Sequence, residues 1–170
     1  MKADIFRYCI LFERGGYYFD ISKSCTRPLR QLHERDSMGV ISFENNKSLK
    51  PAKNEARHLL NYPDNLIIQW GLGFTSEHPF LKKVISLIVA RADFYRGKVF
   101  QNPKDAILEL TGPRAFTEAV VLSATPELMK NISQCGTDFF EAGHYALRGS
   151  YVRFFTRNHY TEYKNSRILS

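Results

Sequence analysis

The sequence predicts a single α/β domain over residues 1–170, in which amphipathic helices pack against short buried strands. Three observations support this class. The first twenty or so residues are typical of a helix, a glycine turn and an aromatic strand, and a longer helical stripe follows at residues 81–95. The chain of 170 residues is 44% hydrophobic and 14% aromatic, which suits one domain with a core of its own.

The first predicted helix has apolar residues at three- and four-residue spacing, the period of one packed helical face. Gly15 and Gly16 end this helix, because glycine adopts the left-handed conformation that commonly closes helices. The aromatic run Tyr17–Ile21 has strong strand propensity. Asp20 stands at the carboxyl end of that strand, where open α/β sheets bind ligands. The expected apolar face consists of Ile5, Tyr8, Cys9 and Phe12.

Asp4 and Arg7 lie three residues apart and so share one face of this helix, which is expected to differ from the apolar face. A carboxylate and a guanidinium held side by side near Asp20 are able to bind the hydroxyl groups of a sugar. The same spacing is also typical of a weak ion pair on a solvated surface. Spacing alone leaves both interpretations open.

The remaining predicted elements, in chain order, are a strand at 38–43, a polar surface loop at 44–57, a strand at 65–71, and helices at 81–95, 104–110 and 113–122. Thr75 or Ser76 is expected to cap the helix at 81–95, with Pro79 in its first turn. His78 is interpreted as a turn residue rather than a ligand. The apolar stripe of this helix is expected to contain Leu81, Val84, Ile85, Ile88, Val89 and Ala92.

Composition narrows the environment and the partners. The net charge of +7 favours anionic partners, namely nucleotide diphosphates or phospholipid head groups. Nucleic acid is not expected, because the basic residues are scattered and no recognition motif is present. The three cysteines have unrelated spacings, and neither a signal peptide nor a membrane span is evident, so a reduced cytoplasmic compartment is predicted.

The segments ADIFRY at residues 3–8 and LFERGGYYFD at residues 11–20 resemble the signature of the glycosyltransferases that contain the DXD sugar-binding motif. That family includes mannosyltransferases and enzymes of capsular polysaccharide biosynthesis, with the clostridial glucosylating toxins as distant relatives. The resemblance implies that the donor-sugar residues are Asp4, Arg7, Tyr18 and, by a looser match, Gln69. It implies that Asp20 contacts the nucleotide ribose and a divalent metal, Mn²⁺ or Mg²⁺.

Ser22 occupies the position of the second aspartate in the DXD motif. A neutral hydroxyl is a poorer ligand for a hard cation than a carboxylate. Three alternatives are therefore open: other residues complete the metal site, metal binding is weak, or the protein is degenerate. His144 is a candidate to supply an imidazole to the metal in place of the missing carboxylate.

Two later motifs also resemble the family. The first is Thr111-Gly112-Pro113 with Thr117, and the second is His144 followed by Gly149-Ser150-Tyr151. Thr111, Gly112 and Ser150 are therefore candidates for contacts with an acceptor or a phosphate. The last residues, 152–170, are basic and aromatic, which suits a final packing arm, contact with a membrane surface or contact with a polymeric acceptor.

The resemblance covers nearly all of the chain but only about the carboxyl-terminal two-thirds of a usual domain of the family. It implies a GT-A-like nucleotide-diphospho-sugar transferase fold lacking its first strand–helix units, with the gap filled by a partner, a second copy or further chain. The expected function is metal-assisted, retaining transfer of a hexose from a nucleotide-diphosphate sugar to a saccharide or lipid-linked acceptor. The alternatives are a non-catalytic nucleotide-sugar-binding remnant and a truncated pseudoenzyme. No catalytic nucleophile is assigned.

Overall fold

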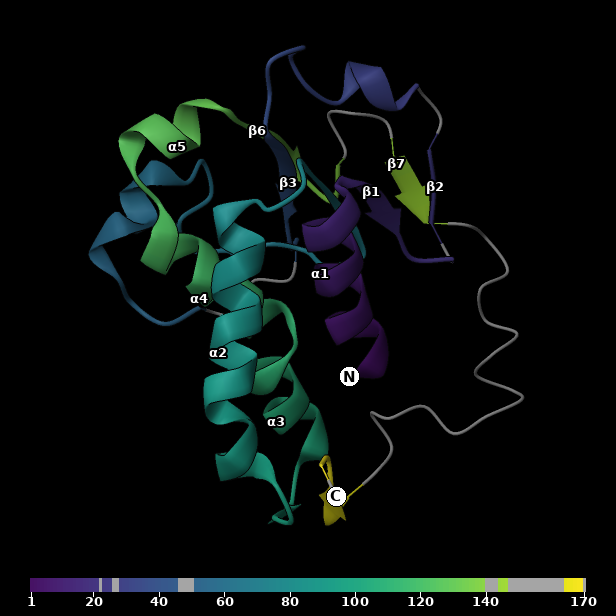
Figure 1. The fold of residues 1–170 in the computed structure, drawn as a ribbon, viewed down its shortest axis with the longest axis vertical. Helices are drawn as coiled ribbons and strands as arrows, with labels where there is room; N and C mark the ends of the chain where they lie inside the picture. The colour runs from purple at the N-terminus through teal and green to yellow at the C-terminus, as the bar shows by residue number, and fades with distance from the viewer. Residues whose placement is uncertain (22, 26–27, 46–50, 140–143, 147–163, 170) are drawn as a thin grey trace.

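The fold, seen in a computed structural model, is a mixed sheet covered on one face by helices (Figure 1). The structure describes residues 1–21, 23–25, 28–45, 51–139, 144–146 and 164–169. The helices are α1 (Lys2–Arg14), α2 (Pro79–Tyr95), α3 (Pro103–Leu110), α4 (Pro113–Ser123) and α5 (Pro126–Lys130), with 3-10 turns η1 (Leu29–Gln31) and η2 (Glu55–Leu59). The strands are β1 (Gly16–Phe19), β2 (Lys23–Cys25), β3 (Gly39–Phe43), β4 (Gly71–Phe74), β5 (Val99–Phe100), β6 (Ile132–Thr137), β7 (His144–Ala146) and β8 (Ser166–Arg167). The predicted α/β class is confirmed.

Within the described residues the main sheet has the order β1-β4-β3-β6. β4 runs antiparallel to both β1 and β3, whereas β3 and β6 are parallel. Two small ribbons, β2-β7 and β5-β8, stand apart from this sheet. β1 is an edge strand of this sheet. Asp20, which follows β1 directly, therefore also lies at the edge and not in the middle of the sheet.

Side chains alternate across the sheet and build a core on each face. Ile41 and Phe43 of β3 join the larger core, which α1, α2 and α4 cover, as Figure 1 shows. Val40 of the same strand joins a smaller core with Leu32, Ile68, Cys135 and Phe139. Every residue of β3 is buried as a result.

The helices begin where the sequence places proline. α2, α3, α4 and α5 each have proline in the first turn, where its missing N–H leaves no hydrogen bond unmade. The predicted helices at 81–95, 104–110 and 113–122 are confirmed within one or two residues. Among the described helices, none is long and apolar enough to cross a lipid bilayer.

Four details differ from the expectations. The predicted strand at 65–71 is wrong: residues 66–69 are buried but irregular apart from one bridge at Ile67, and the strand β4 begins at Gly71. His78 caps α2, because its side chain accepts a hydrogen bond from the amide of Phe80. Val89, expected on the buried stripe of α2, is 70% exposed. In the polar loop expected at 44–57, the described residues include the first turn of η2.

A fifth difference concerns α1. The buried residues of this helix are Arg7, Tyr8 and Leu11, and Cys9 of the predicted apolar face is exposed. The helix is rotated relative to the prediction because Arg7 finds carboxylate and carbonyl partners inside the protein. The polar face of α1 is therefore an inner face.

Candidate functional site

The candidate site is a cavity of about 760 Å³ at the junction of α1, the end of β1 and α3. Its walls contain five of the residues that the sequence motifs assign to donor-sugar or nucleotide binding. These are Asp4, Arg7, Tyr18, Asp20 and Gln69. Residues far apart in the chain thus meet at one place.

Arg7 lies at the centre of this group and is only 5% exposed. Its Nη2 lies 3.3 Å from Asp4 Oδ1 and 3.4 Å from Asp20 Oδ1. Its Nη1 donates to the main-chain carbonyl of Gln69 at 3.1 Å. A buried guanidinium is tolerated only where anionic or carbonyl partners surround it, so Arg7 fixes two carboxylates and a loop relative to one another.

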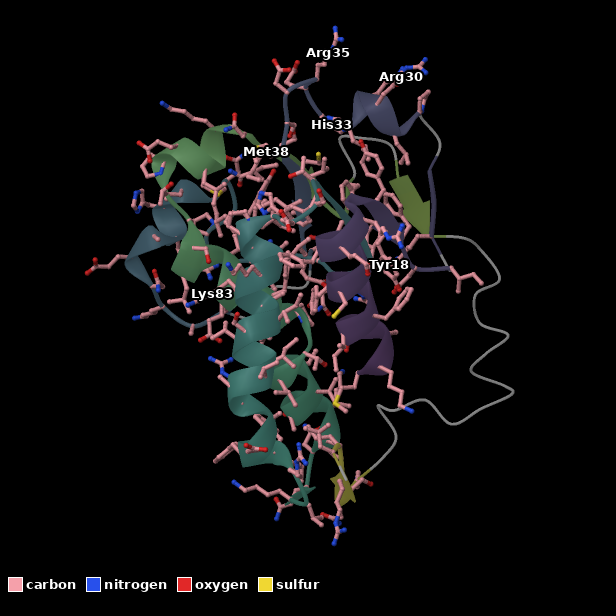
Figure 2. All side chains as sticks on the ribbon, in the orientation of Figure 1. Tyr18, Arg30, His33, Arg35, Met38 and Lys83 are labelled. Carbon is pink, nitrogen blue, oxygen red and sulfur yellow. The ribbon has the colours of Figure 1, made fainter. Side chains whose placement is uncertain are left out.

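Tyr18 links Asp20 to the same cluster. Its hydroxyl donates to Asp20 Oδ1 at 3.0 Å, and the Arg7 guanidinium lies 4.9 Å from the centre of its ring. Figure 2 shows the Tyr18 side chain beside α1. Burial, more than the neighbouring charges, raises the pKa of Tyr18. The phenol therefore stays protonated near neutral pH and keeps its role as a hydrogen-bond donor to the carboxylate.

Thr111, which follows α3, holds the opposite side of the cluster. Its hydroxyl donates to Asp4 Oδ2 at 2.9 Å. Its carbonyl accepts from the Tyr8 hydroxyl at 3.0 Å and from Gln69 Nε2 at 2.9 Å. The sequence motif predicts that Thr111 contacts an acceptor or a phosphate. The residue is fully buried, however, so its hydroxyl orients Asp4 and does not itself reach the cavity. The sequence separation of 107 residues hides this link from any local pattern.

Gly112 also differs from its expected role. Its amide donates to the carbonyl of Ile107 at 2.8 Å, and a Cβ at this position would lie 2.5 Å from the Cα of Leu108. The glycine is thus required for the close turn between α3 and α4, and its N–H is already bonded. A direct contact of this amide with an acceptor or phosphate does not fit that geometry.

The other assigned residues are described only in part. Ser22 and Ser150 lie outside the described residues, and His144 is described only as the start of β7, paired in register with Cys25. Asp20 is one-third exposed and faces the cavity. Among the described side chains no group of three His, Cys, Asp or Glu could hold a metal ion. The described residues by themselves thus supply no group of three such metal ligands, and Ser22 and the side chain of His144 lie outside them.

Three further residues of the cavity are not indicated by the sequence motifs. Glu44, Trp70 and Lys104 all line it. Burial, with a smaller effect of Asp138, raises the pKa of the Glu44 carboxyl. Their separate positions in the chain give no periodic signal, and only the packing of β3, β4 and α3 brings them together. Lys104 supplies a cation that suits an anionic ligand.

The sequence of this chain is similar to the sequences of known proteins. Residues 1–39 match the family described as "Glycosyltransferase sugar-binding region containing DXD motif". The chain is 27% identical over 153 residues to an initiation-specific alpha-1,6-mannosyltransferase of Candida albicans (strain SC5314), covering 81% of this chain and 40% of that protein. It is 25% identical over 129 residues to the protein of the same name from Schizosaccharomyces pombe (strain 972), covering 71% of this chain and 31% of that protein.

A solved structure is also similar. The PaToxG glycosyltransferase matches with a TM-score of 0.46 and 20% sequence identity, over 71% of this chain and 34% of that chain. The chain thus spans less than half the length of the relatives that it matches. The resemblance drawn from the sequence motifs is confirmed: residues 1–39 are similar to the glycosyltransferase sugar-binding region that contains the DXD motif, and the chain is similar to two named mannosyltransferases.

Proposed function

We propose that this chain is a glycosyltransferase domain with a GT-A-like fold that transfers a hexose from a nucleotide-diphosphate sugar to a saccharide or lipid-linked acceptor. The observation that carries the proposal is the convergence of Asp4, Arg7, Tyr18, Asp20 and Gln69 on one cavity. The named function of the two fungal relatives makes mannose the first donor sugar to test.

We assign different roles to the charged groups of the cavity. Asp4 and Asp20 offer carboxylate oxygens that accept hydrogen bonds from sugar or ribose hydroxyls. Arg7 and Thr111 hold these carboxylates in place from behind, which keeps them ordered before the ligand arrives. Lys104 supplies positive charge within the same cavity, where a diphosphate would be stabilised electrostatically.

In the proposed reaction, a bond forms between an acceptor hydroxyl oxygen and the anomeric carbon of the donor sugar. The bond from that carbon to the diphosphate oxygen breaks, and the proton of the acceptor hydroxyl passes to the departing nucleotide diphosphate. Retention of configuration and assistance by Mn²⁺ or Mg²⁺ are part of the proposal through the family resemblance. No described residue is assigned as a nucleophile, and no step above depends on a metal.

A second candidate function follows from Ser22, which replaces the second aspartate of the motif. A chain with this substitution could bind a nucleotide sugar without turning it over, because the leaving diphosphate would lack part of its stabilisation. Turnover separates this binding remnant from an active transferase.

The experiment is a scan of UDP- and GDP-sugars for binding and hydrolysis by the purified chain, with and without manganese. Asp20→Ala is the test variant, and Asp36→Ala, an exposed aspartate outside the cavity, is the control for the change of charge. Binding and hydrolysis that are lost only in Asp20→Ala would support the transferase, and binding without hydrolysis would support the remnant. A folded chain that binds no donor would overturn both.

A further inference from the structure

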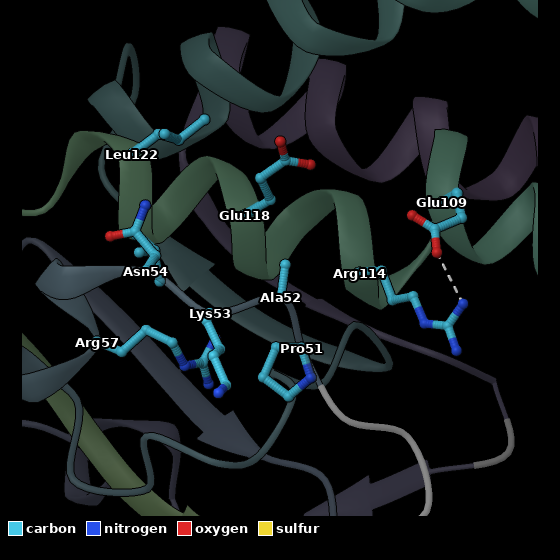
Figure 3. Close-up of a pocket in the computed structure, with 10 residues that line it drawn as sticks. Pro51, Ala52, Lys53, Asn54, Arg57, Glu109, Arg114, Glu118 and Leu122 are labelled. Atoms are coloured by element: carbon cyan, nitrogen blue, oxygen red, sulfur yellow. Dashed lines mark hydrogen bonds and ion pairs between the residues drawn. The ribbon is translucent and has the colours of Figure 1, made fainter.

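A second cavity, of about 390 Å³, lies between residues 51–57 and α4 (Figure 3). On one side it is lined by Lys53, Asn54 and Arg57, and on the other by Glu109, Arg114 and Glu118. None of these residues belongs to a sequence motif or to the site described above. This cavity is therefore distinct in its lining from the donor cavity.

Four of the five charged side chains that line this cavity are held in place by other groups of the protein. Arg114 Nη1 pairs with Glu109 Oε1 at 2.8 Å, a contact drawn as a dashed line in Figure 3. Both oxygens of Glu118 accept from Arg91, at 2.8 Å and 2.6 Å. Arg57 donates to the carbonyls of Pro63 and Asn65. A ligand would thus meet polar groups that are already ordered, which lowers the entropic penalty of binding.

The mixture of groups favours one class of ligand. Two carboxylates beside the cations disfavour a strongly anionic ligand, and the charges disfavour a wholly apolar one. Donors from Lys53 and Arg114 and acceptors from Glu109 and Glu118 suit the hydroxyl groups of a neutral saccharide, which both donate and accept. Apolar side chains complete the lining and suit the C–H groups of a sugar ring: Pro51, Ala52, Val121 and Leu122.

The position of the cavity connects it with the donor site. Leu108 and Pro113 line the donor cavity, whereas their chain neighbours Glu109 and Arg114 line the second cavity. The close turn at Gly112 joins α3, which contains Leu108 and Glu109, to α4, which begins with Pro113 and Arg114. The α3–α4 junction thus contributes residues to the walls of both cavities.

We propose that the cavity between residues 51–57 and α4 binds the neutral saccharide acceptor of the reaction. This inference rests on the proposed function, since it names the second substrate of the same transferase. It also moves acceptor recognition from Thr111 and Gly112, which are buried, to the polar residues of this cavity, among which Glu109 and Arg114 are close to them in the chain.

The test is Ala52→Trp, which fills the cavity from an exposed position without removing a charged group. Ala90→Trp, at an exposed position of α2 outside both cavities, is the matched control. Two properties are measured on the full chain: binding of manno-, gluco- and galacto-oligosaccharides by saturation-transfer NMR, and transfer to the bound oligosaccharide alongside hydrolysis of the donor alone. Equal unfolding temperatures of the two variants verify that both are folded.

We expect Ala52→Trp to raise the KM for the acceptor by about tenfold or more, equivalent to about 1.4 kcal/mol of binding, and to weaken the NMR signal in parallel. Donor hydrolysis should stay within about twofold of the unmodified chain, because the donor cavity is intact. An unchanged acceptor KM and NMR signal in Ala52→Trp would overturn the acceptor site. So would an unmodified chain that hydrolyses the donor but binds no neutral oligosaccharide. Absence of both donor binding and hydrolysis in the unmodified chain would instead overturn the proposed function.

Discussion

At the scale of single residues, Thr111 helps to fix the orientation of Asp4, together with Arg7 and the amino group of Met1. Its hydroxyl is the described side-chain donor to Asp4 Oδ2. Thr111→Val keeps the shape and removes this charge-assisted hydrogen bond, which is worth about 1.5–3 kcal/mol. We expect kcat/KM for donor hydrolysis to fall by about tenfold to a hundredfold. Steady-state kinetics across donor concentrations would measure this loss.

Two companion variants separate positioning from stability. Thr111→Ser keeps the hydroxyl and should restore kcat/KM to within about threefold of the unmodified chain. Tyr8→Phe removes a hydrogen bond to the carbonyl of the same threonine but leaves Asp4 untouched. It should lower the unfolding temperature without a comparable loss of activity. Equal kinetic losses in Thr111→Val and Tyr8→Phe would show a purely structural role.

Arg7 gives a second prediction at this scale. Its guanidinium contacts Asp4, Asp20 and the carbonyl of Gln69 at once, and a lysine ammonium cannot reproduce this planar geometry. Arg7→Lys should weaken donor binding by about tenfold or more, because both carboxylates lose their fixed orientation. Calorimetric titration with the nucleotide sugar measures the effect. Arg14→Lys, at the exposed end of α1, is the control and should bind the donor normally.

At the scale of elements, the turn between α1 and β1 positions two parts of the donor site relative to each other. One part is Asp4 and Arg7 on α1, and the other is Tyr18 and Asp20 at the end of β1. Gly15 has φ of 65° and ψ of −165°, a conformation that only glycine adopts readily. A Cβ at this position would also lie 2.7 Å from the main-chain nitrogen of Ser76. Gly15→Ala should therefore lower the free energy of unfolding by about 3 kcal/mol.

Gly97 supplies the matched control for that turn. Its φ is 71°, but a Cβ there would meet no atom within 4 Å. Gly97→Ala should lower the free energy of unfolding by only about 1 kcal/mol, from the left-handed conformation alone. Urea unfolding of both variants gives the comparison. Equal losses would mean that the contact with Ser76 has no part in placing α1.

The elements also show what sequence could and could not predict. The helices α2, α3 and α4 have clear apolar periods and prolines at their starts, so local signals were sufficient. The sequence does not predict β4, because two of its four residues are glycines, which strands usually avoid. Gly71 and Gly73 are needed there because a Cβ would lie 2.8 Å from Phe139 and 2.7 Å from Tyr17. Such a requirement is visible only when both packed faces are known.

The candidate site, too, is predictable from the sequence only in part. The neighbours Asp4 and Arg7 could be paired from their spacing, and Tyr18 and Asp20 from the motif. The inner placement of Arg7 could not, because α1 turns its polar face toward partners that lie 13 and 62 residues away. Long-range hydrogen bonds of this kind leave no periodic pattern in the chain. They are, however, what makes the site rigid.

At the scale of the whole molecule, His78 lies where α1, α2 and β4 meet. It is 1% exposed, and its ring packs against Phe74 and Phe80. Its Nδ1 accepts a hydrogen bond from the amide of Phe80, so the neutral ring carries its proton on Nε2, which has no hydrogen-bond partner in the described structure. Protonation would place a charge in the core and remove the acceptor that caps α2. Burial accordingly lowers the pKa of His78 to about 4.

This depressed pKa makes global stability depend on pH. Between pH 6.5, the ordinary value, and about pH 4, the unfolded chain binds a proton at His78 that the folded chain does not. The free energy of unfolding is therefore highest above pH 6.5 and should fall by about 3 kcal/mol as the pH drops through this range. Urea unfolding at a series of pH values measures the slope.

His78→Asn isolates this effect, because asparagine can cap a helix but does not titrate. The variant should be less stable than the unmodified chain at pH 7, since a buried ring is lost, yet its stability should change much less between pH 6.5 and 4. Glu44 and Asp138 have the opposite effect on the pH dependence. Burial raises the pKa of both carboxyl groups, so their contribution to the stability of the folded chain increases as the pH falls. A pH slope that is the same in His78→Asn and the unmodified chain would assign the acid sensitivity to other groups.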